Sequence, residues 1–303
     1  MSLESRPYLL HALSPLHVGT GQSVGLIDLP IARLRATNIP FVPGSSLKGV
    51  LREAHRGRLP PAEWEALFGP QRKTSGAAGD EPQDGDHAGA LVVGDARLVA
   101  LPVRSFRGTY ALVTSPMSLH LTRRDFAGLK GLPERIPQPP GPGARVGPGS
   151  ITLTRQDRLL LEDLDLDAQK DPLVEEWARF LAWAWPEEAE AWRQRLTVVD
   201  DGTMDFLLET GTQVDTRVRI DAQTGTVAAG QLWQEESLPA ESLLVGVLAA
   251  GRSLRKGVEL SAAEVLTRAL AGMELLQLGG KATVGRGRCR LAAWPVASRE
   301  ARR

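Results

Sequence analysis

The residues best suited to chemistry lie in one short stretch, residues 17–52, which combines a histidine, a glycine-rich loop, a carboxylate and a basic helix start. It reads His17-Val-Gly-Thr-Gly, then Ile27-Asp28-Leu29-Pro30, then Pro43-Gly44-Ser45-Ser46-Leu47-Lys48-Gly49, and closes on Arg52. Glycines let main-chain amides approach an anion closely, and a carboxylate or an imidazole can take up a proton. The combination is typical of a place where a phosphate backbone is held and cut.

Residues 45–57 predict a helix whose first turn Ser45 or Ser46 can cap. Lys48 and Arg52 lie one turn apart on its polar side. Unpaired N–H groups at a helix start favour an anion, and the two cations would strengthen that preference. The alternative is an ordinary capped helix with solvated cations, because the spacing is not that of a Walker loop.

Asp28 is a lone carboxylate between apolar neighbours, and His17 precedes it in the same stretch. Asp28 can cap a turn. It can also take a proton or hold a divalent cation together with substrate phosphate oxygens, because magnesium often accepts only one or two protein carboxylates. His17 can act as a general acid or base, or it can be a packed, hydrogen-bonding residue. No His-Glu-x-x-His or cysteine cluster is present, so zinc chemistry is not supported.

A second glycine-rich basic segment covers residues 278–288, Leu-Gly-Gly-Lys-Ala-Thr-Val-Gly-Arg-Gly-Arg. Lys281 and Arg286 supply positive charge there. A strand rather than a helix is expected to follow, so the segment matches neither a Rossmann nor a P-loop fingerprint. It is either an anion-binding loop or a tight glycine turn.

The composition limits the class of protein. The chain has 303 residues, 42% of them hydrophobic, and a formal net charge of +0. Nucleic-acid-binding proteins usually carry a basic excess, so any such binding must come from local clusters. The single cysteine, Cys289, excludes an intramolecular disulfide. No signal-peptide core and no run of about 18 apolar residues is present, so we expect a cytoplasmic protein without membrane contact.

The coarse element pattern favours an α+β fold. Strands are expected at 8–14, 90–103, 109–114, 241–250 and 283–294, and helices at 45–57, 61–68, 118–129, 171–195 and 261–276. Residues 214–231 predict a β-hairpin that turns at Gly225. Residues 71–89 are expected to be a loop, and 133–149 hold too many prolines and glycines for a helix or a central strand. The order of elements is compatible with a ferredoxin-like βαββαβ core, and the tryptophans of 171–195 are expected in the core.

The chain resembles the RAMP proteins of CRISPR systems, in particular the repeating backbone subunit of type III-B (Cmr) effector complexes. The matching segments spread over most of the chain: Pro15-Leu-His-Val-Gly-Thr-Gly, Ile27-Asp-Leu-Pro-Ile, Pro43-Gly-Ser-Ser-Leu-Lys-Gly with Leu51-Arg-Glu, Arg219-Ile-Asp, Gly230-Gln-Leu-Trp-Gln-Glu-Glu with Leu238-Pro, and the late glycine-rich loop. The late loop is shared by many RAMP proteins. The Ile-Asp-Leu-Pro and Gly-Gln-Leu-Trp segments are more specific.

The resemblance implies one RAMP domain over residues 1–303 with a ferredoxin-like (RRM-like) palm and a protruding β-hairpin thumb at about 212–238. Inserted loops are expected at about 70–90 and 133–149 and a helical insertion at about 171–195, and the Pro/Gly-rich insert at 133–149 is no part of the RAMP pattern. Copies of such a subunit stack in a filament along the guide RNA. The thumb kinks the guide–target duplex at regular intervals, and a loop aspartate beside each kink supports metal-dependent cleavage of the target RNA.

Carried over by resemblance, Asp28 is the catalytic aspartate and the residue that binds a divalent cation, Mg²⁺ or Mn²⁺, when target RNA is present. His17 matches a histidine near the cleavage site, and Glu235 and Glu236 lie near the thumb base beside the scissile phosphate. The expected RNA-binding residues are Lys48, Arg52, Ser45, Ser46, Lys281, Arg286, Arg217 and Arg219. The implied partners are guide RNA, single-stranded target RNA, further copies of the chain and other type III-B effector subunits.

Two other functions stay open at this level. The chain can be a structural guide-RNA-binding filament subunit without its own catalysis. It can also be a stand-alone endonuclease that processes precursor guide RNA with His17 as the base. An enzyme acting on a small phosphate compound is less well supported, because no nucleotide-binding fingerprint is present.

Overall fold

The computed structural model describes residues 3–21, 27–70 and 87–294. Its helices are α1 (Gly44–Ala54), α2 (Pro61–Phe68), α3 (Pro116–Asp125), α4 (Pro172–Leu181), α5 (Ala189–Arg195), α6 (Asp201–Thr210) and α7 (Ala262–Leu270), with 3₁₀ turns η1 (Ala182–Ala184), η2 (Pro186–Glu188) and η3 (Ala282–Val284). Its strands are β1 (Glu4–Ala12), β2 (Phe41–Val42), β3 (Leu91–Val93), β4 (Ala96–Arg104), β5 (Tyr110–Thr114), β6 (Ala144–Val146), β7 (Arg158–Leu161), β8 (Leu164–Lys170), β9 (Leu196–Val199), β10 (Gln213–Ile220), β11 (Val227–Ser237), β12 (Leu243–Ala250), β13 (Leu275–Gln277) and β14 (Arg288–Ala293). Over the described ranges, no helix has the length and apolar character needed to cross a membrane.

Four neighbouring strands form the palm. β14, β1, β12 and β4 lie side by side in that order, and each pairs antiparallel with its neighbour. In chain order the sequence is β1, α1, β4, β12, α7, β14, so the sheet order is fourth, first, third, second. This is the βαββαβ arrangement of a ferredoxin-like unit. The expected α+β fold with a ferredoxin-like palm is therefore confirmed.

The palm strands β1, β12 and β4 are buried on both faces, which explains why β1 reads as an unbroken apolar run. Tyr8 and Leu10 belong to a core shared with α1, α2, α6 and α7, whereas Leu9 points into a second core against α3, α4 and α5. Successive side chains of a strand alternate between faces. Trp177 and Trp192 are fully buried in the second core, and Trp183 and Trp185 pack against it, as expected.

Beyond β4 the sheet continues through β5, β9, β6, β8 and β7. This corrects the prediction for residues 133–149, because β6 lies between β9 and β8 and is a central strand. The prolines and glycines that argued against a strand flank the three residues Ala144–Val146 and leave them free to pair. The strands β7, β8 and β9 and the helix α6 had no counterpart in the predicted elements.

Two predicted boundaries near the C-terminal end are also wrong. The helix expected over 261–276 ends at Leu270, Gly272 follows with φ of +70°, and residues 275–277 form β13. The strand expected over 283–294 begins only at Arg288. Of the loop predicted over 71–89, residues 71–86 lie outside the described residues.

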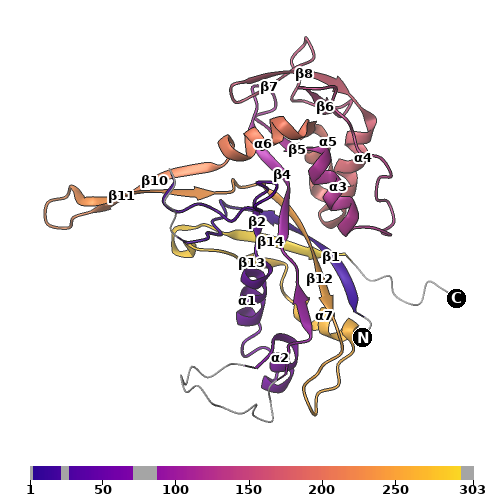
Figure 1. Ribbon diagram of the computed structural model, residues 1–303, viewed down its shortest axis with the longest axis vertical. Coiled ribbons are helices and arrows are strands. Elements are labelled where there is room, and N and C mark those ends of the chain that lie inside the picture. The colour runs from indigo at the N-terminus through magenta and orange to yellow at the C-terminus, as the bar shows by residue number, and fades with distance from the viewer. Residues whose placement is uncertain (1–2, 22–26, 71–86, 295–303) are drawn as a thin grey trace.

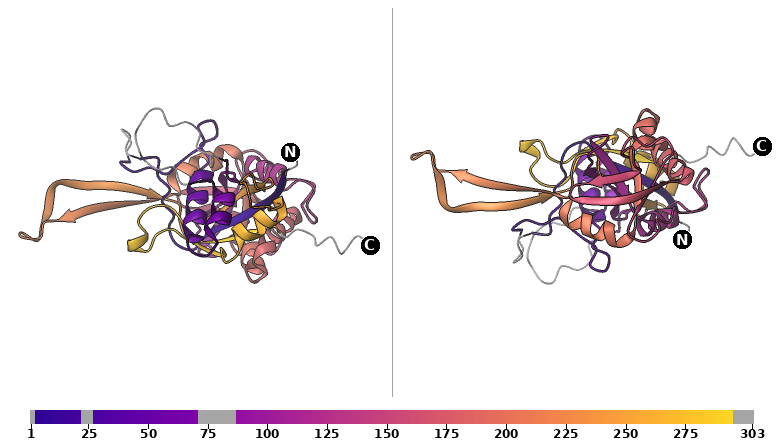
Figure 2. Two further views of the ribbon diagram at one scale, coloured as in Figure 1. Left: turned by 90° about the horizontal axis from the view of Figure 1, so that it is seen from below. Right: turned by 90° about the horizontal axis from the view of Figure 1, so that it is seen from above.

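A long hairpin, the thumb (β10 and β11), projects from the body of the molecule (Figure 1). Figure 2 shows it from two further sides, reaching well beyond the helices and the palm. Cross-strand partners share a face, so the register gives the thumb two unlike faces. One carries the exposed apolar side chains Val214, Val218 and Leu232 together with Thr216, Gln234 and Glu236. The other carries Gln213, Asp215, Arg217, Trp233, Glu235 and Ser237. The register shifts between Val218 and Ile220, and beyond this shift the exposed Ile220 pairs with the exposed Val227.

Candidate functional site

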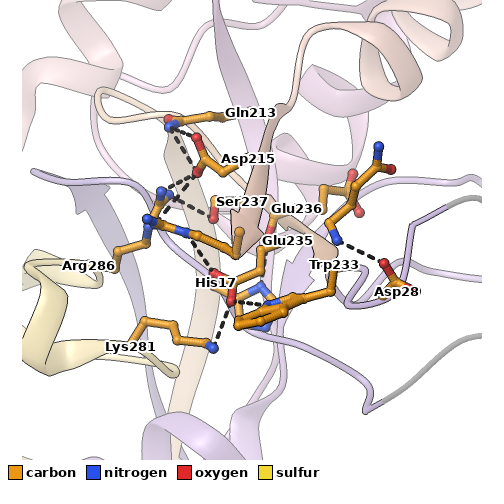
Figure 3. A network of polar contacts seen from close by, with 12 residues as sticks. His17, Asp28, Gln213, Asp215, Trp233, Glu235, Glu236, Ser237, Lys281 and Arg286 are labelled. Carbon is orange, nitrogen blue, oxygen red and sulfur yellow. Dashed lines mark hydrogen bonds and ion pairs between the residues drawn. The ribbon is translucent and has the colours of Figure 1, made fainter. Parts of the chain in front are cut away.

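The segment that carries Asp28 runs along β11 at the base of the thumb, where Leu29 forms a parallel β-bridge with Glu235. Leu29 N donates to Gln234 O at 3.1 Å, and Glu236 N donates to Leu29 O at 3.0 Å. Asp28 is exposed, and its Oδ2 accepts a hydrogen bond from Gln234 N at 2.8 Å (Figure 3). The carboxylate is thus fixed to the thumb by main chain while it still faces solvent.

His17 lies buried beneath this segment. Its Nδ1 is 2.6 Å from Glu236 O. A carbonyl oxygen can only accept, so Nδ1 carries the hydrogen, and in the neutral ring Nε2 holds the lone pair. A Cβ at Gly19 would lie 2.8 Å from His17 Nε2, and a Cβ at Gly279, where φ is +72°, would lie 2.1 Å from His17 O. Both glycine-rich loops therefore close on the histidine at positions where only glycine fits.

The side chain of Glu236 connects the Asp28 segment to the start of the thumb. Its buried carboxylate accepts hydrogen bonds from Ile31 N at 3.0 Å and Thr212 Oγ1 at 2.9 Å, and it forms an ion pair with Arg33. All of these partners are protein groups. Glu236 therefore lies at the thumb base, as expected, with a side chain that holds the Asp28 segment.

Glu235 is equally buried and faces the other side of β11. Its Oε1 accepts from Lys281 Nζ and Trp233 Nε1, both at 2.7 Å, and Arg217 Nε lies 3.4 Å from Oε2. Burial would raise the pKa of Glu235, but the bonds from Lys281 and Trp233 and the charges of Lys281 and Arg217 hold it below its ordinary value. A carboxylate that stays ionised and fully bonded orients its neighbours rather than transferring a proton.

The late glycine-rich loop is fastened to the thumb by two ion pairs. Lys281 meets Glu235, and the buried Arg286 meets Asp215 and donates to Ser237 Oγ at 3.1 Å. Figure 3 shows these side chains converging on β10 and β11 from the loop side. The loop therefore braces the thumb, and the expected RNA contacts of Lys281 and Arg286 stay predictions.

The residues predicted on α1 lie apart from the thumb base. Ser45 and Ser46 do not cap the helix, because the N-cap is Pro43 and Gly44 N donates to Asp95 Oδ1 at 2.7 Å. That carboxylate already occupies the first amide of the expected anion site. Ser45 is exposed and Ser46 is half-buried, so both stay within reach of a ligand.

The two cations of α1 each have a partner in the protein. Lys48 Nζ donates to Leu91 O at 2.8 Å, and burial, followed by the charge of Arg52, lowers the pKa of Lys48. The guanidinium of Arg52 lies 4.4 Å from the centre of the Trp64 ring. Within the described part of the chain, no hydrogen bond or ion pair joins these side chains to the residues of the thumb base, His17, Asp28, Glu235 and Glu236.

The thumb itself presents two of the predicted arginines. Arg217 is half-buried beside Asp215 and Glu235, whereas Arg219 is exposed nearer the tip. Across residues 3–21, 27–70 and 87–294, no group of three or more His, Cys, Asp or Glu is arranged to hold a metal ion. The described residues alone therefore supply no such ligand set. Asp28, a single exposed carboxylate, fits a cation that shares its ligands with phosphate oxygens.

The structure thus brings together His17 and Asp28 from the first loop, Glu235 and Glu236 from the thumb, and Lys281 and Arg286 from the late loop. Sequence reasoning missed Arg33 and Asp215. The signal for them was indirect: two adjacent glutamates at the end of an alternating strand require cations or donors once they are buried.

Comparisons with known proteins agree on one family. The model of the RAMP superfamily matches residues 9–290. The CRISPR system Cmr endoribonuclease Cmr4 of Pyrococcus furiosus is 33% identical over 285 residues, which cover 92% of this chain and 92% of the relative.

Solved structures show the same likeness. The crystal structure of oligomeric Cmr4 from Pyrococcus furiosus matches with a TM-score of 0.72 and 26% identity, covering 98% of this chain and 100% of that one. A chain of the cryo-EM structure of the Type III-B Cmr-beta bound to cognate target RNA matches with a TM-score of 0.71 and 20% identity, covering 96% and 97%. At that identity the second likeness speaks for the fold alone.

Proposed function

Because the chain belongs to the RAMP superfamily, we propose that it is the repeating backbone subunit of a type III-B CRISPR ribonucleoprotein that binds guide RNA and cleaves complementary target RNA. The relative is named as a Cmr endoribonuclease, and the fold matches a chain of a complex with target RNA. Guide pairing selects the sequence, while the protein contacts backbone and shape.

The observation that carries the proposal is the placement of Asp28. Its carboxylate is exposed, tied to Gln234 N, and set at the root of a hairpin that projects from the body. A hairpin that unstacks one nucleotide can bring a ribose 2′-hydroxyl in line with its own phosphate. Asp28 then lies at the edge of that distortion, where it can take the proton of the attacking hydroxyl. As the new O–P bond forms, the bond from phosphorus to the 5′-oxygen of the next nucleotide breaks, which leaves a 2′,3′-cyclic phosphate and a 5′-hydroxyl that takes up a proton from water.

A divalent cation would fit this site if Asp28 and the RNA supply its ligands together. Asp28 would hold it together with RNA phosphate oxygens, and when bound it would neutralise charge that develops on the phosphate. His17 is a second candidate for proton transfer, because its Nδ1–H is fixed on Glu236 O, which leaves the Nε2 lone pair as the acceptor in the neutral ring.

The guide-binding surface is proposed to lie on α1 and along the thumb. Lys48, Arg52, Ser45 and Ser46 present charge and hydroxyl groups on α1, and Arg217 and Arg219 do so on the thumb. A subunit that packs against copies of itself needs positive groups only along the RNA channel. A net charge of +0 is therefore compatible with RNA binding.

The test is Asp28→Asn in the assembled complex, supplied with magnesium or manganese. The amide keeps the shape and can still accept from Gln234 N, but it neither takes a proton nor holds a cation well. We expect target cleavage to stop while guide and target binding stay unchanged, and we expect a chelator to stop the wild-type reaction. Asp163→Asn, an exposed carboxylate between β7 and β8, is the matched control. A normal cleavage rate in Asp28→Asn would remove Asp28 from the mechanism.

A further inference from the structure

We propose that Arg33 is a positioning residue that holds Asp28 in place through Glu236. This inference rests on the proposed function, because it assigns Arg33 a part in the same cleavage. Arg33 lies downstream of Asp28, and its side chain is 19% exposed. It does not touch Asp28 and acts through the segment between them.

The guanidinium of Arg33 links three parts of the fold. Nη2 donates to Glu236 Oε1 at 2.5 Å and to Leu208 O, near the end of α6, at 2.8 Å. Nη1 donates to Asn38 O at 3.2 Å. One planar side chain thus joins α6, the turn at residues 34–39 and the thumb strand β11.

Glu236 transmits this position to the Asp28 segment. Its Oε2 accepts from Ile31 N at 3.0 Å, and its main-chain N donates to Leu29 O at 3.0 Å. These two bonds pin the chain on the C-terminal side of Asp28, and the bond from Gln234 N pins the carboxylate itself. The position of the Asp28 segment along β11 therefore depends on where the Glu236 carboxylate lies.

Arg33 supplies the charge that keeps Glu236 in this position. Among the described residues, Arg33 is the ion-pair partner of Glu236, and the other donors to its carboxylate are neutral. A buried carboxylate that loses its cation takes up a proton or moves toward water. Either change weakens its hold on Ile31 N, so Asp28 shifts relative to the thumb.

The geometry also calls for arginine rather than lysine. The donors of Arg33 reach a carboxylate and two carbonyl oxygens at once, which suits a planar fork of N–H groups. A lysine keeps the charge but presents a single ammonium. Arg33→Lys should thus keep the ion pair, lose the bridge to the 34–39 turn, and cleave at a rate between wild type and Arg33→Met.

The experiment compares wild type, Arg33→Met, Arg33→Lys and the double variant Arg33→Met with Glu236→Gln, each in the assembled complex. Arg35→Met is the matched control, because Arg35 is exposed and lies two residues away. The readouts are single-turnover cleavage, target-RNA affinity and hydrogen exchange of the Leu29 and Ile31 amides. Exchange reports the segment directly and needs no catalysis.

In Arg33→Met we expect cleavage to fall about tenfold or more, as small misplacements of a reacting group do, with target affinity unchanged. The Leu29 and Ile31 amides should exchange faster, while the β1 amides keep their protection. The double variant should regain part of the loss, because no unpaired buried charge is left. Arg35→Met should match wild type.

Three outcomes overturn the inference. Arg33→Met can cleave at the wild-type rate with unchanged exchange, or it can lose affinity, cleavage and β1 protection together, which marks a general structural role. The double variant can be as slow as Arg33→Met, which removes Glu236 from the linkage. If the wild-type complex does not cleave at all, the proposed function fails, and the exchange data still decide whether Arg33 holds the segment.

Discussion

Lys48 is a residue whose surroundings disfavour its charged form yet leave it able to bind a phosphate. Its ammonium has three donors, and one of them goes to Leu91 O. Burial and the neighbouring Arg52 both lower its pKa, since each disfavours the charged form. A phosphate oxygen beside it would act in the opposite direction and favour the charged form.

We therefore expect Lys48→Ala to weaken guide-RNA binding and to flatten its salt dependence. Removing one phosphate contact should lower the slope of log affinity against log salt by about 0.7–0.9. Lys170 is an exposed lysine on β8, near the far end of the sheet, and pairs with Asp157. Lys170→Ala should leave the slope unchanged. Titrations at several salt concentrations measure both. An unchanged slope in Lys48→Ala excludes Lys48 from the contacts.

At this scale, the resemblance led us to expect Asp28, His17 and the two glutamates near one another, because they lie in short segments with a recognisable order. The structure brings them together at the thumb base, and their roles stay predictions. Sequence alone did not reveal their partners. Arg33 and Glu236 are separated by 203 positions, and Asp215 and Arg286 by 71. Such pairs are created by the fold, so Lys281 and Arg286 read as anion-binding loop residues although both are engaged with carboxylates of the thumb.

Among the elements, the thumb is joined to the late glycine-rich loop by ion pairs. An isolated two-stranded hairpin is marginal in water, and here its root is held by the Asp28 segment on one edge and by the late loop through ion pairs. Sequence alternation was enough to predict the hairpin. It was not enough for β6, whose pairing with β8 and β9 comes from the sheet and not from local propensity.

Lys281→Met tests whether the ion pair between Lys281 of the late loop and Glu235 of the thumb stabilises the fold. It leaves the buried Glu235 without its nearest cation, and removing one partner of a buried charged group costs about 1–3 kcal/mol. Because the folded-state pKa of Glu235 lies below its ordinary value, the stabilisation is present above the unfolded pKa of about 4.3 and disappears as pH falls through the folded pKa. The difference in unfolding free energy between wild type and Lys281→Met should thus be largest at neutral pH and shrink in acid. Urea unfolding of both proteins at neutral pH and at acid pH measures this difference. A difference that does not change with pH would contradict the ion-pair explanation.

The whole molecule is organised by one sheet that serves two cores. β1, β4 and β12 each contribute side chains to both: Leu9 and Leu10, Val99 and Leu98, and Val245 and Leu244 point to opposite faces. Each of these three strands is therefore packed on both faces, and the two cores share them. This continuity links the helices that cover the palm to those packed behind it, and it provides a rigid base for the thumb.

Such a shared sheet predicts one cooperative unfolding transition for the chain. Trp177→Ala in the core behind the palm should lower the unfolding free energy by about 3–5 kcal/mol, and Leu51→Ala in the core under α1 by about 2–5 kcal/mol. The two sites lie in different cores, so their effects should add in the double variant. Urea unfolding followed by circular dichroism and by tryptophan fluorescence should give coincident curves in every case. If Trp177→Ala instead splits the curve into two transitions, the cores unfold separately, and the thumb would be anchored to the palm alone.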